Sequence, residues 1–336
     1  MKRSRATRAR SRLRLRAALI AALASALAGC WSPAPPTPGG SFRFAVFGDG
    51  PYYAHENGRA RRVIEALNAR PLEFVIHVGD IMWKRCTDAA YRERRGLIET
   101  IRHPVVYTPG DNEWLDCVDI GWSADDPLDR LASLRATFFS PADRSLGEVP
   151  LRLESQSSAA AHAEFVENAR WFHGGVQFVT IHVVGSANGR RSFPGRTERH
   201  DEEVARRTQA AVDWLHDSFR AAIASDAAAV VVALHANPTY APSAAEHEPY
   251  APVEDALVEL AKHFGKPTLV IHGDEHRYTL DRPFRDPATG APVPNLQRLE
   301  TFGSPDIGWV DVVVDTTLAE PFRRAECHAA LDVVVV

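Results

Sequence analysis

The segment Thr268-Leu-Val-Ile271 runs directly into His272-Gly-Asp-Glu-His276. The first part is short and apolar, which predicts a buried strand, and the second places two imidazoles and two carboxylates at the end of that strand. Open α/β sheets usually hold their functional sites at the carboxyl ends of their strands. The segment therefore predicts an α/β fold with a polar site at one edge of a sheet.

Four other apolar runs end in the same way, with Asp, Asn or His directly behind the predicted strand. The candidate strands are Phe44-Ala-Val-Phe47, Phe74-Val-Ile-His-Val78, Pro104-Val-Val-Tyr107 and Val230-Val-Val-Ala-Leu234. The polar residues that follow them are Asp49, Asp80, Asp111 with Asn112 and Glu113, and His235 with Asn237. Five strand ends of this kind predict one shared site.

Helices are predicted between these strands. Apolar residues at helical spacing, together with capping and stop residues, indicate helices at 57–69, 88–101, 128–139, 197–224 and 252–264. The segment 171–184 has two β-rich runs around a Gly-Gly pair, which predicts an antiparallel hairpin, and the tail 295–315 returns to strands. We therefore expect a mixed α/β (α+β) fold with two packed mixed β-sheets flanked by helices.

The first 29 residues predict a signal peptide of the lipoprotein type. Residues 1–16 carry eight Lys or Arg and no acid, and the short apolar run behind them ends in Leu27-Ala-Gly-Cys30. This run is shorter than the ~20 apolar residues that a membrane span needs. The ending resembles a bacterial lipobox, which implies cleavage before Cys30 and lipidation of its thiol. An ordinary cleaved signal with an incidental cysteine is the alternative.

The rest of the chain then divides into a flexible linker at 30–41, rich in Pro and Gly, and a single domain at 42–336. We expect an exported protein of the cell envelope that faces the periplasm and contacts the membrane through lipidated Cys30. Without the eight basic residues of the leader, 31 basic residues stand against 43 acidic ones, a formal charge of about −12. Such a charge argues against a nucleic acid partner.

The order of the strand-end motifs resembles that of the calcineurin-like metallophosphoesterase superfamily. In this chain the motifs are Asp49, Gly79-Asp80, Gly110-Asp-Asn-Glu113, His235 and Gly273-Asp-Glu-His276. The usual pattern of the superfamily is Asp-x-His, Gly-Asp, Gly-Asn-His-(Glu/Asp), His and Gly-His-x-His. The resemblance extends from Phe42 to about Asp315, and it implies a four-layer sandwich with two sheets between helices.

The resemblance also implies a site for two divalent metal ions. Asp80 would bridge the ions, Asp49 and His276 would complete the protein ligands of the first ion, and His235 would bind the second. Two ions ~3.5–4 Å apart can hold a phosphoryl group and supply a hydroxide near neutral pH. The carboxylate-rich ligand set favours manganese, iron or magnesium over zinc.

Several positions depart from the superfamily pattern. Asp111 stands in place of the Asn ligand and Asp274 in place of the first His of Gly-His-x-His, and both still offer oxygen ligands. Pro51 stands where Asp-x-His has its His, and it cannot bind a metal. The gap left by Pro51 would be filled by His55, Tyr52, Tyr53 or water.

Asn112 stands where the superfamily carries its usual catalytic His. It can donate a hydrogen bond to a phosphate oxygen, but it cannot protonate a leaving group near neutral pH. The proton would come from His182, from His272 or from a metal-bound water, or the substrates would need good leaving groups. We take Asn112 and His182 as candidate catalytic residues. The alternative for His182 is a structural role in the core. The alternative for His272 is to orient the metal ligands.

The sequence therefore predicts a phosphoesterase that uses metal-activated hydroxide to hydrolyse a phosphomonoester or phosphodiester of a small molecule. The alternative is a catalytically impaired metal-binding or scaffold lipoprotein on the same fold, because of the departures at Pro51, Asn112 and Asp274. Cys86 and Cys117 each follow a site motif, so we also expect a disulfide that braces the rim of the site. The oligomeric state is left open.

Overall fold

The computed structural model describes residues 40–83, 86–119, 125–323 and 327–329. The predicted signal peptide, and the predicted linker up to residue 39 with Cys30, lie outside the described residues. All described residues fall in one compact unit, Pro38–Val336. Within them, no helix is both long enough and apolar enough to cross a membrane.

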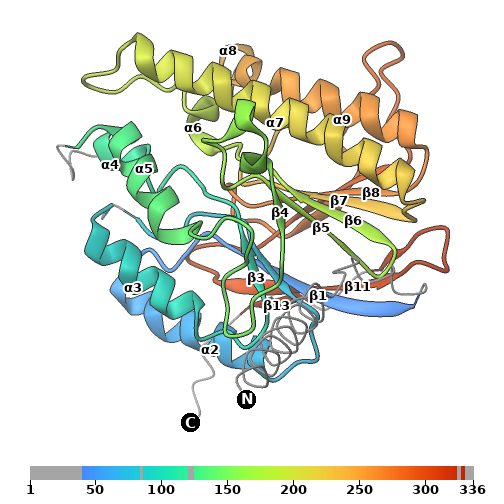
Figure 1. Ribbon diagram of the computed structural model, residues 1–336, viewed down its shortest axis with the longest axis horizontal. Coiled ribbons are helices and arrows are strands. Elements are labelled where there is room, and N and C mark those ends of the chain that lie inside the picture. Colours follow the sequence, from blue (N-terminus) through green and yellow to red (C-terminus); the bar gives the residue numbers. More distant parts are fainter. Residues whose placement is uncertain (1–39, 84–85, 120–124, 324–326, 330–336) are drawn as a thin grey trace, which may run out of the picture. The chain divides into compact units, whose positions relative to one another are not determined.

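The first β-sheet contains the strands nearest the start of the domain and those nearest its end (Figure 1). Its strand order is β12-β11-β1-β2-β3, and β13 also pairs with β11. The strands β1, β2 and β3 are parallel, whereas β11 is antiparallel to β1. The bounds are β1 (Ser41–Phe47), β2 (Val75–His77), β3 (Val105–Tyr107), β11 (Gly308–Asp315), β12 (Phe322–Arg323) and β13 (Cys327–Ala329).

The second sheet has the order β4-β5-β6-β7-β8-β10-β9. Its central strands β6, β7, β8 and β10 are parallel, and both edges are antiparallel. The predicted hairpin is confirmed as the antiparallel pair of β5 and β6. The bounds are β4 (Glu154–Ser155), β5 (Ala169–His173), β6 (Val176–Thr180), β7 (Ala229–Ala233), β8 (Thr268–His272), β9 (Thr279–Asp281) and β10 (Leu296–Glu300).

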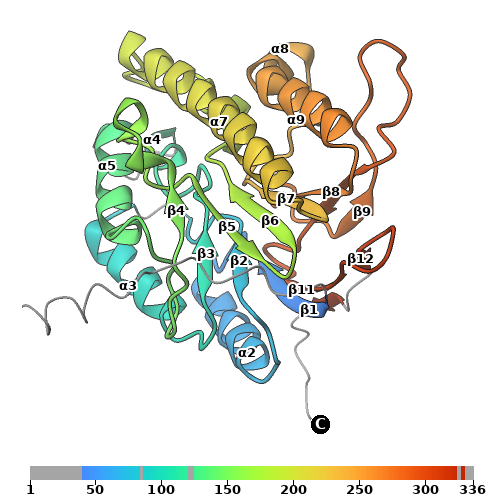
Figure 2. The same ribbon diagram turned by 45° about the vertical axis from the view of Figure 1, so that its right-hand side comes forward.

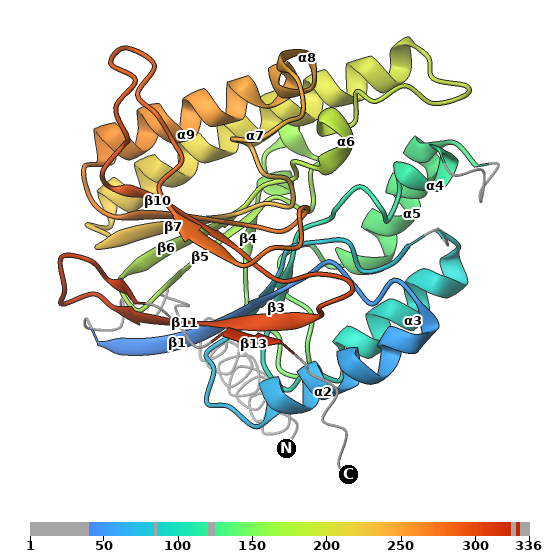
Figure 3. The same ribbon diagram turned by 180° about the vertical axis from the view of Figure 1, so that it is seen from behind.

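Helices cover the outer face of each sheet, as Figures 2 and 3 show from two further sides. Helices α2 (Asn57–Asn68), α3 (Asp88–Ile98) and α5 (Pro127–Phe138) lie on the first sheet, and α7 (Glu198–Ala224) and α9 (Ala251–Phe264) lie on the second. All five correspond to predicted helices. Short helices lie in the loops, namely α4 (Asp116–Asp119), α6 (Gly185–Asn188), α8 (Ala244–His247), η1 (Ala54–Glu56), η2 (Gln156–Ser158), η3 (Ala160–His162) and η4 (Glu248–Tyr250).

Alternation along the strands produces three apolar layers. In β1, Phe44 and Val46 point into the layer between the sheets, whereas Ala45 and Phe47 point toward α2 and α3. Between the sheets, the rings of Phe74 and Phe178 meet edge to face at 4.9 Å. Because both faces of each sheet are buried, the central strands are apolar throughout. The predicted four-layer arrangement, with two packed mixed sheets between helices, is therefore confirmed.

A disulfide joins Cys86 to Cys117, with their Cα atoms 6.0 Å apart, as predicted. Cys86 lies in the loop between β2 and α3, and Cys117 lies in α4. Helix α4 is therefore tied covalently to the loop that precedes α3. The crosslink holds together the two segments that follow Asp80 and Asp111.

Candidate metal centre

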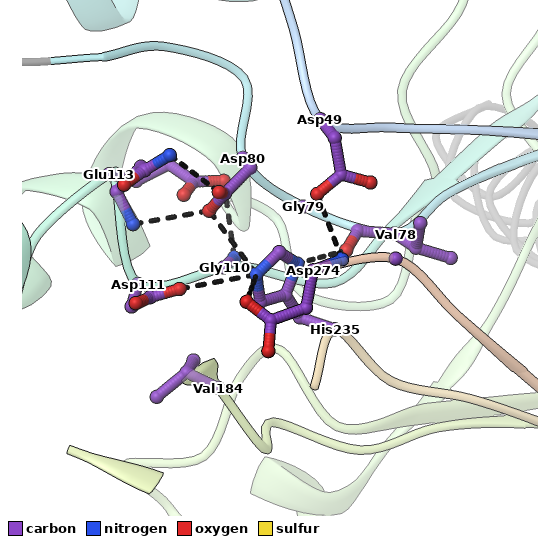
Figure 4. A network of polar contacts seen from close by, with 12 residues as sticks. Asp49, Val78, Gly79, Asp80, Gly110, Asp111, Glu113, Val184, His235 and Asp274 are labelled. Atoms are coloured by element: carbon purple, nitrogen blue, oxygen red, sulfur yellow. Dashed lines mark hydrogen bonds and ion pairs between the residues drawn. The ribbon is translucent and has the colours of Figure 1, made fainter. Parts of the chain in front are cut away.

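Strand ends from both sheets meet at one place. The side chains that gather there are Asp49, Asp80 and Asp111, which follow β1, β2 and β3, and His235, Asp274 and His276, which follow β7 and β8. Figure 4 shows Asp80, Asp111 and Asp274 pointing toward His235, with Asp49 close by. All six residues of the predicted ligand set are thus brought together.

Ligand atoms of five of these residues, all but His276, form two groups that share His235. In the first group, one ligand atom each from Asp49, Asp80 and His235 lies within 4.8 Å of the others. The second group joins Asp111, His235 and Asp274 in the same way. One imidazole nitrogen can bind only one ion, so His235 would serve one of two neighbouring cation positions, and a carboxylate would have to bridge them.

His235 is oriented by the backbone so that one ring nitrogen faces these carboxylates. Its Nδ1 lies 2.7 Å from the carbonyl oxygen of Val78, which can only accept, so Nδ1 carries the proton. In the neutral ring Nε2 then has a lone pair, and it faces carboxylate oxygens of Asp111, Asp80 and Asp274 at 3.2, 3.4 and 3.5 Å. This arrangement is typical of a metal-binding histidine.

His276 is held in the same manner. Its Nδ1 donates to the carbonyl oxygen of Ser304 at 2.7 Å, and its Nε2 lies 3.6 Å from Oδ1 of Asp49. The hydroxyl of Tyr52 is 3.2 Å from that Nε2 and donates to Oδ2 of Asp80 at 2.8 Å. Of the three side chains that could fill the gap left by Pro51, Tyr52 therefore reaches the centre.

Asn112 contacts the carboxylate expected to bridge the ions. Its backbone N–H donates to Oδ1 of Asp80 at 3.1 Å, and its side-chain amide donates to Oδ2. The close approach of these loops requires glycine at Gly110, because a Cβ there would collide with the Asp80 carboxylate, and at Gly273, where it would collide with Asp49.

The backbone at the site adopts a conformation that residues with a Cβ rarely accept. The φ angles of Asp49, Asp80, Asp274 and His276 are 53°, 55°, 78° and 64°, all in the left-handed region. Such strained positions in non-glycine residues concentrate at functional sites. The chain thus turns sharply after β1, β2 and β8 and aims these ligand side chains at the common centre.

Burial and neighbouring charges shift the ionisation of the site. Burial raises the pKa of Asp49 and of Asp80 well above the usual range, although the charge of His235 opposes the shift in both. Burial would raise the pKa of Asp111 too, but the neighbouring imidazole of His235 and a hydrogen bond from Ser186 leave it lowered. Burial would lower the pKa of His235, but the surrounding carboxylates raise it well above 6.5. The centre therefore favours the binding of protons or metal cations between its carboxylates.

Four of the six ligand candidates, Asp80, Asp111, Asp274 and His276, line a pocket of about 710 Å³. Its other lining residues include Tyr53, His55, Trp83, Tyr240 and Tyr250. The described residues that line the pocket include seven carboxylates and only one guanidinium, that of Arg191. In addition, Oδ2 of Asp49 and Nε2 of His235 are buried without a hydrogen-bond partner. Buried unpaired ligand atoms beside an acidic pocket fit divalent cations.

His182 is not brought into this pocket. Its ring is fully buried, and Nδ1 lies 2.7 Å from Oε1 of Glu167, which also accepts hydrogen bonds from Arg135. Burial would raise the pKa of Glu167, but Arg135 and His182 lower it to about 2. A buried ionic network of this kind gives His182 the structural role that the sequence left as its alternative. His272 is also fully buried and does not line the pocket.

Several residues that support the ligands carry no signal in the sequence. The hydroxyl of Ser186 lies 2.7 Å from Oδ2 of Asp111 and 2.9 Å from Oδ1 of Asp116. Glu56 is fully buried, where it accepts hydrogen bonds from the backbone of Tyr52 and from the hydroxyl of Ser304. Most of these contacts join segments far apart in the chain, so no local pattern could reveal them.

Comparison with known proteins agrees with this geometry. The family model "Calcineurin-like phosphoesterase" matches residues 42–278, and the chain belongs to this family. Among solved structures, that of PhoD is similar at 13% identity with a TM-score of 0.55, covering 88% of this chain and 70% of PhoD. A search of curated protein sequences found no match.

Two further structures resemble the chain more weakly. The protein TT1561 of Thermus thermophilus matches with a TM-score of 0.44 and 11% identity, over 86% of this chain and 99% of TT1561. A novel phosphatase from Mycoplasma pneumoniae matches with a TM-score of 0.42 and 11% identity, over 86% of this chain and 93% of the phosphatase. These scores are too low to carry an argument.

The contacts of Tyr52 lead to a prediction about metal affinity. We expect Tyr52→Phe to weaken Mn²⁺ binding by about 10- to 100-fold, because the hydroxyl that orients Asp80 and faces His276 is removed. Isothermal titration of the metal-stripped protein measures the effect. Tyr53→Phe is the matched control, since Tyr53 is 49% exposed on the wall of the same pocket. Unchanged affinity in Tyr52→Phe would contradict the assignment.

Proposed function

We propose that this protein is a metal-dependent phosphoesterase that hydrolyses a small phosphomonoester or phosphodiester with two divalent ions. Manganese, iron or magnesium fits the carboxylate-rich centre better than zinc. The observation that carries the proposal is the orientation of the two imidazoles. Both His235 and His276 donate from Nδ1 to a backbone carbonyl, which frees each Nε2 to bind a metal beside buried carboxylates.

The charge of the pocket supports a need for cations. A phosphate ester is an anion, and seven carboxylates line the pocket against one guanidinium. Without bound cations, electrostatic repulsion would oppose substrate binding. When bound, the two ions would neutralise this charge, polarise the phosphoryl group and activate water as the nucleophile.

Individual side chains would bridge the ions and contact the substrate. Asp80 is the candidate bridging ligand, because its oxygens face His235 on one side and Tyr52 on the other. Asn112 lines the pocket and holds Asp80 through its amide, so it is placed to turn that amide toward a phosphoryl oxygen. Arg191, on the rim, is placed to contact the same anion.

The Asp80→Asn variant tests the proposal. We expect the full chain to hydrolyse p-nitrophenyl phosphate or bis-p-nitrophenyl phosphate with added Mn²⁺, and Asp80→Asn to lower kcat by at least about 100-fold, because a neutral amide cannot bridge two cations. Hydrolysis is followed by nitrophenolate release, and the metal content of both proteins is measured by elemental analysis.

Asp217→Asn is the control, because it makes the same chemical change on the exposed surface of α7. It should keep the rate and metal content of the parent protein. Full activity in Asp80→Asn, or activity that survives complete metal removal, would overturn the proposal. The ester that is hydrolysed faster shows whether the enzyme prefers phosphomonoesters or phosphodiesters.

A metal-binding or scaffold protein without turnover is the second candidate. One observation favours it: His182 and His272, the imidazoles considered as substitutes for the missing catalytic His, are both buried outside the pocket lining. Two ions per chain without hydrolysis of either ester would support this candidate over the enzyme.

Export and anchoring are also proposals, and they rest on residues 1–39. We propose a periplasm-facing lipoprotein of the cell envelope, held to the membrane through lipidated Cys30, with no nucleic acid partner. In a bacterial host, the full chain should sediment with the membrane fraction. Cys30→Ser should release it or block its processing, whereas an unchanged distribution would argue against lipidation.

A further inference from the structure

A third group of ligand side chains lies beside the candidate metal centre but shares no residue with it. It consists of His272, Glu275 and Glu300. One ligand atom from each lies within 4.8 Å of the other two. None of these residues belongs to the predicted ligand set.

Strand pairing fixes two members of this cluster. His272 ends β8 and Glu300 ends β10, and these strands are parallel neighbours in which the two residues are register partners. Register partners in a sheet point to the same face, so their side chains are adjacent. Glu275 reaches them from the loop that follows β8.

Each side chain has one ligand atom left over. Nδ1 of His272 donates to the carbonyl oxygen of Gly273 at 2.8 Å, and its Nε2 is buried without any partner. Oε2 of Glu275 accepts from the side chain of Asn237, and Oε1 of Glu300 accepts from the backbone N–H of Arg277. Among the described residues, the second oxygen of each carboxylate accepts no hydrogen bond.

Among the described residues, no Lys or Arg side chain hydrogen-bonds to the cluster, although the charges of Arg298 and Arg277 act on Glu300. The nearby guanidinium of Arg298 makes two hydrogen bonds to the carboxylate of Asp281, at 2.8 and 2.7 Å. A buried nitrogen lone pair is costly to leave unpaired, and two adjacent carboxylates repel each other. One bound cation would satisfy all three.

We propose that His272, Glu275 and Glu300 bind a third divalent metal ion. One imidazole nitrogen with two carboxylates suits a transition metal such as zinc or manganese, with water completing the coordination. The ion would tie the ends of β8 and β10 to the loop that carries Asp274 and His276. It therefore holds two ligands of the neighbouring centre in position, and its binding does not depend on hydrolysis.

The test compares metal content in a background where the neighbouring centre is weakened. Full-length Asp80→Asn and Asp80→Asn/Glu300→Gln are stripped of metal, dialysed against Zn²⁺ and analysed for bound zinc. We expect the double variant to hold one ion per chain fewer, and to lose part of the rise in Tm that zinc gives the single variant. Glutamine keeps an acceptor for the N–H of Arg277, so equal Tm values in EDTA check that the fold is retained.

Glu259→Gln in the same background is the control, because Glu259 is exposed on α9 and lies outside both the pocket and the cluster. It should bind as much zinc as Asp80→Asn alone. Equal zinc content with and without Glu300, or no zinc in any variant, would overturn the third site. Because every protein compared carries Asp80→Asn, this result is independent of the hydrolysis assay.

Discussion

The burial of several carboxylates around one imidazole is the constraint on which this structure depends. Asp80, Asp111 and Asp274 face Nε2 of His235 from 3.2 to 3.5 Å, and Asp49 is fully buried beside them. Removing an ionised carboxylate from water costs several kcal/mol unless an opposite charge compensates it. Protons on the buried carboxylates, the imidazolium of His235 or bound metal ions would each offset this cost.

The fold is arranged to build this centre. Two sheets pack face to face through a layer that contains Phe44, Phe74 and Phe178, and this packing brings their strand ends together. Left-handed turns then aim the carboxylates inward, and the Cys86–Cys117 disulfide ties two of the supporting loops. The rigid sandwich thus holds together carboxylates that would otherwise repel each other.

Much of this could be predicted from the sequence, because the signals are local. An apolar run followed by Gly-Asp marks a strand and its polar end wherever it occurs, and the stop at Gly265 marks the end of α9. The order of five such motifs indicated both the sandwich and the six ligand candidates. Helix bounds differed from the predicted ones by at most three residues, as fraying ends lead us to expect.

The features that could not be predicted depend on contacts between residues that are far apart in the sequence. Whether His182 faces a pocket or a core is decided by Glu167 and Arg135, which the sequence does not connect to it. The choice of Tyr52 over Tyr53 follows from the path of one loop. Likewise, the pairing of His272 with Glu300 depends on the register of β8 and β10, and no spacing rule gives that register.

The most direct measurement is a crystal structure of the full chain soaked with Mn²⁺, with anomalous scattering used to locate the ions. We expect two strong peaks about 3.5–4 Å apart, one on each side of the Asp80 carboxylate, within bonding distance of His276 and His235 respectively. A map without peaks at Asp80, or with a single ion that Asp80 does not contact, would contradict the two-metal centre.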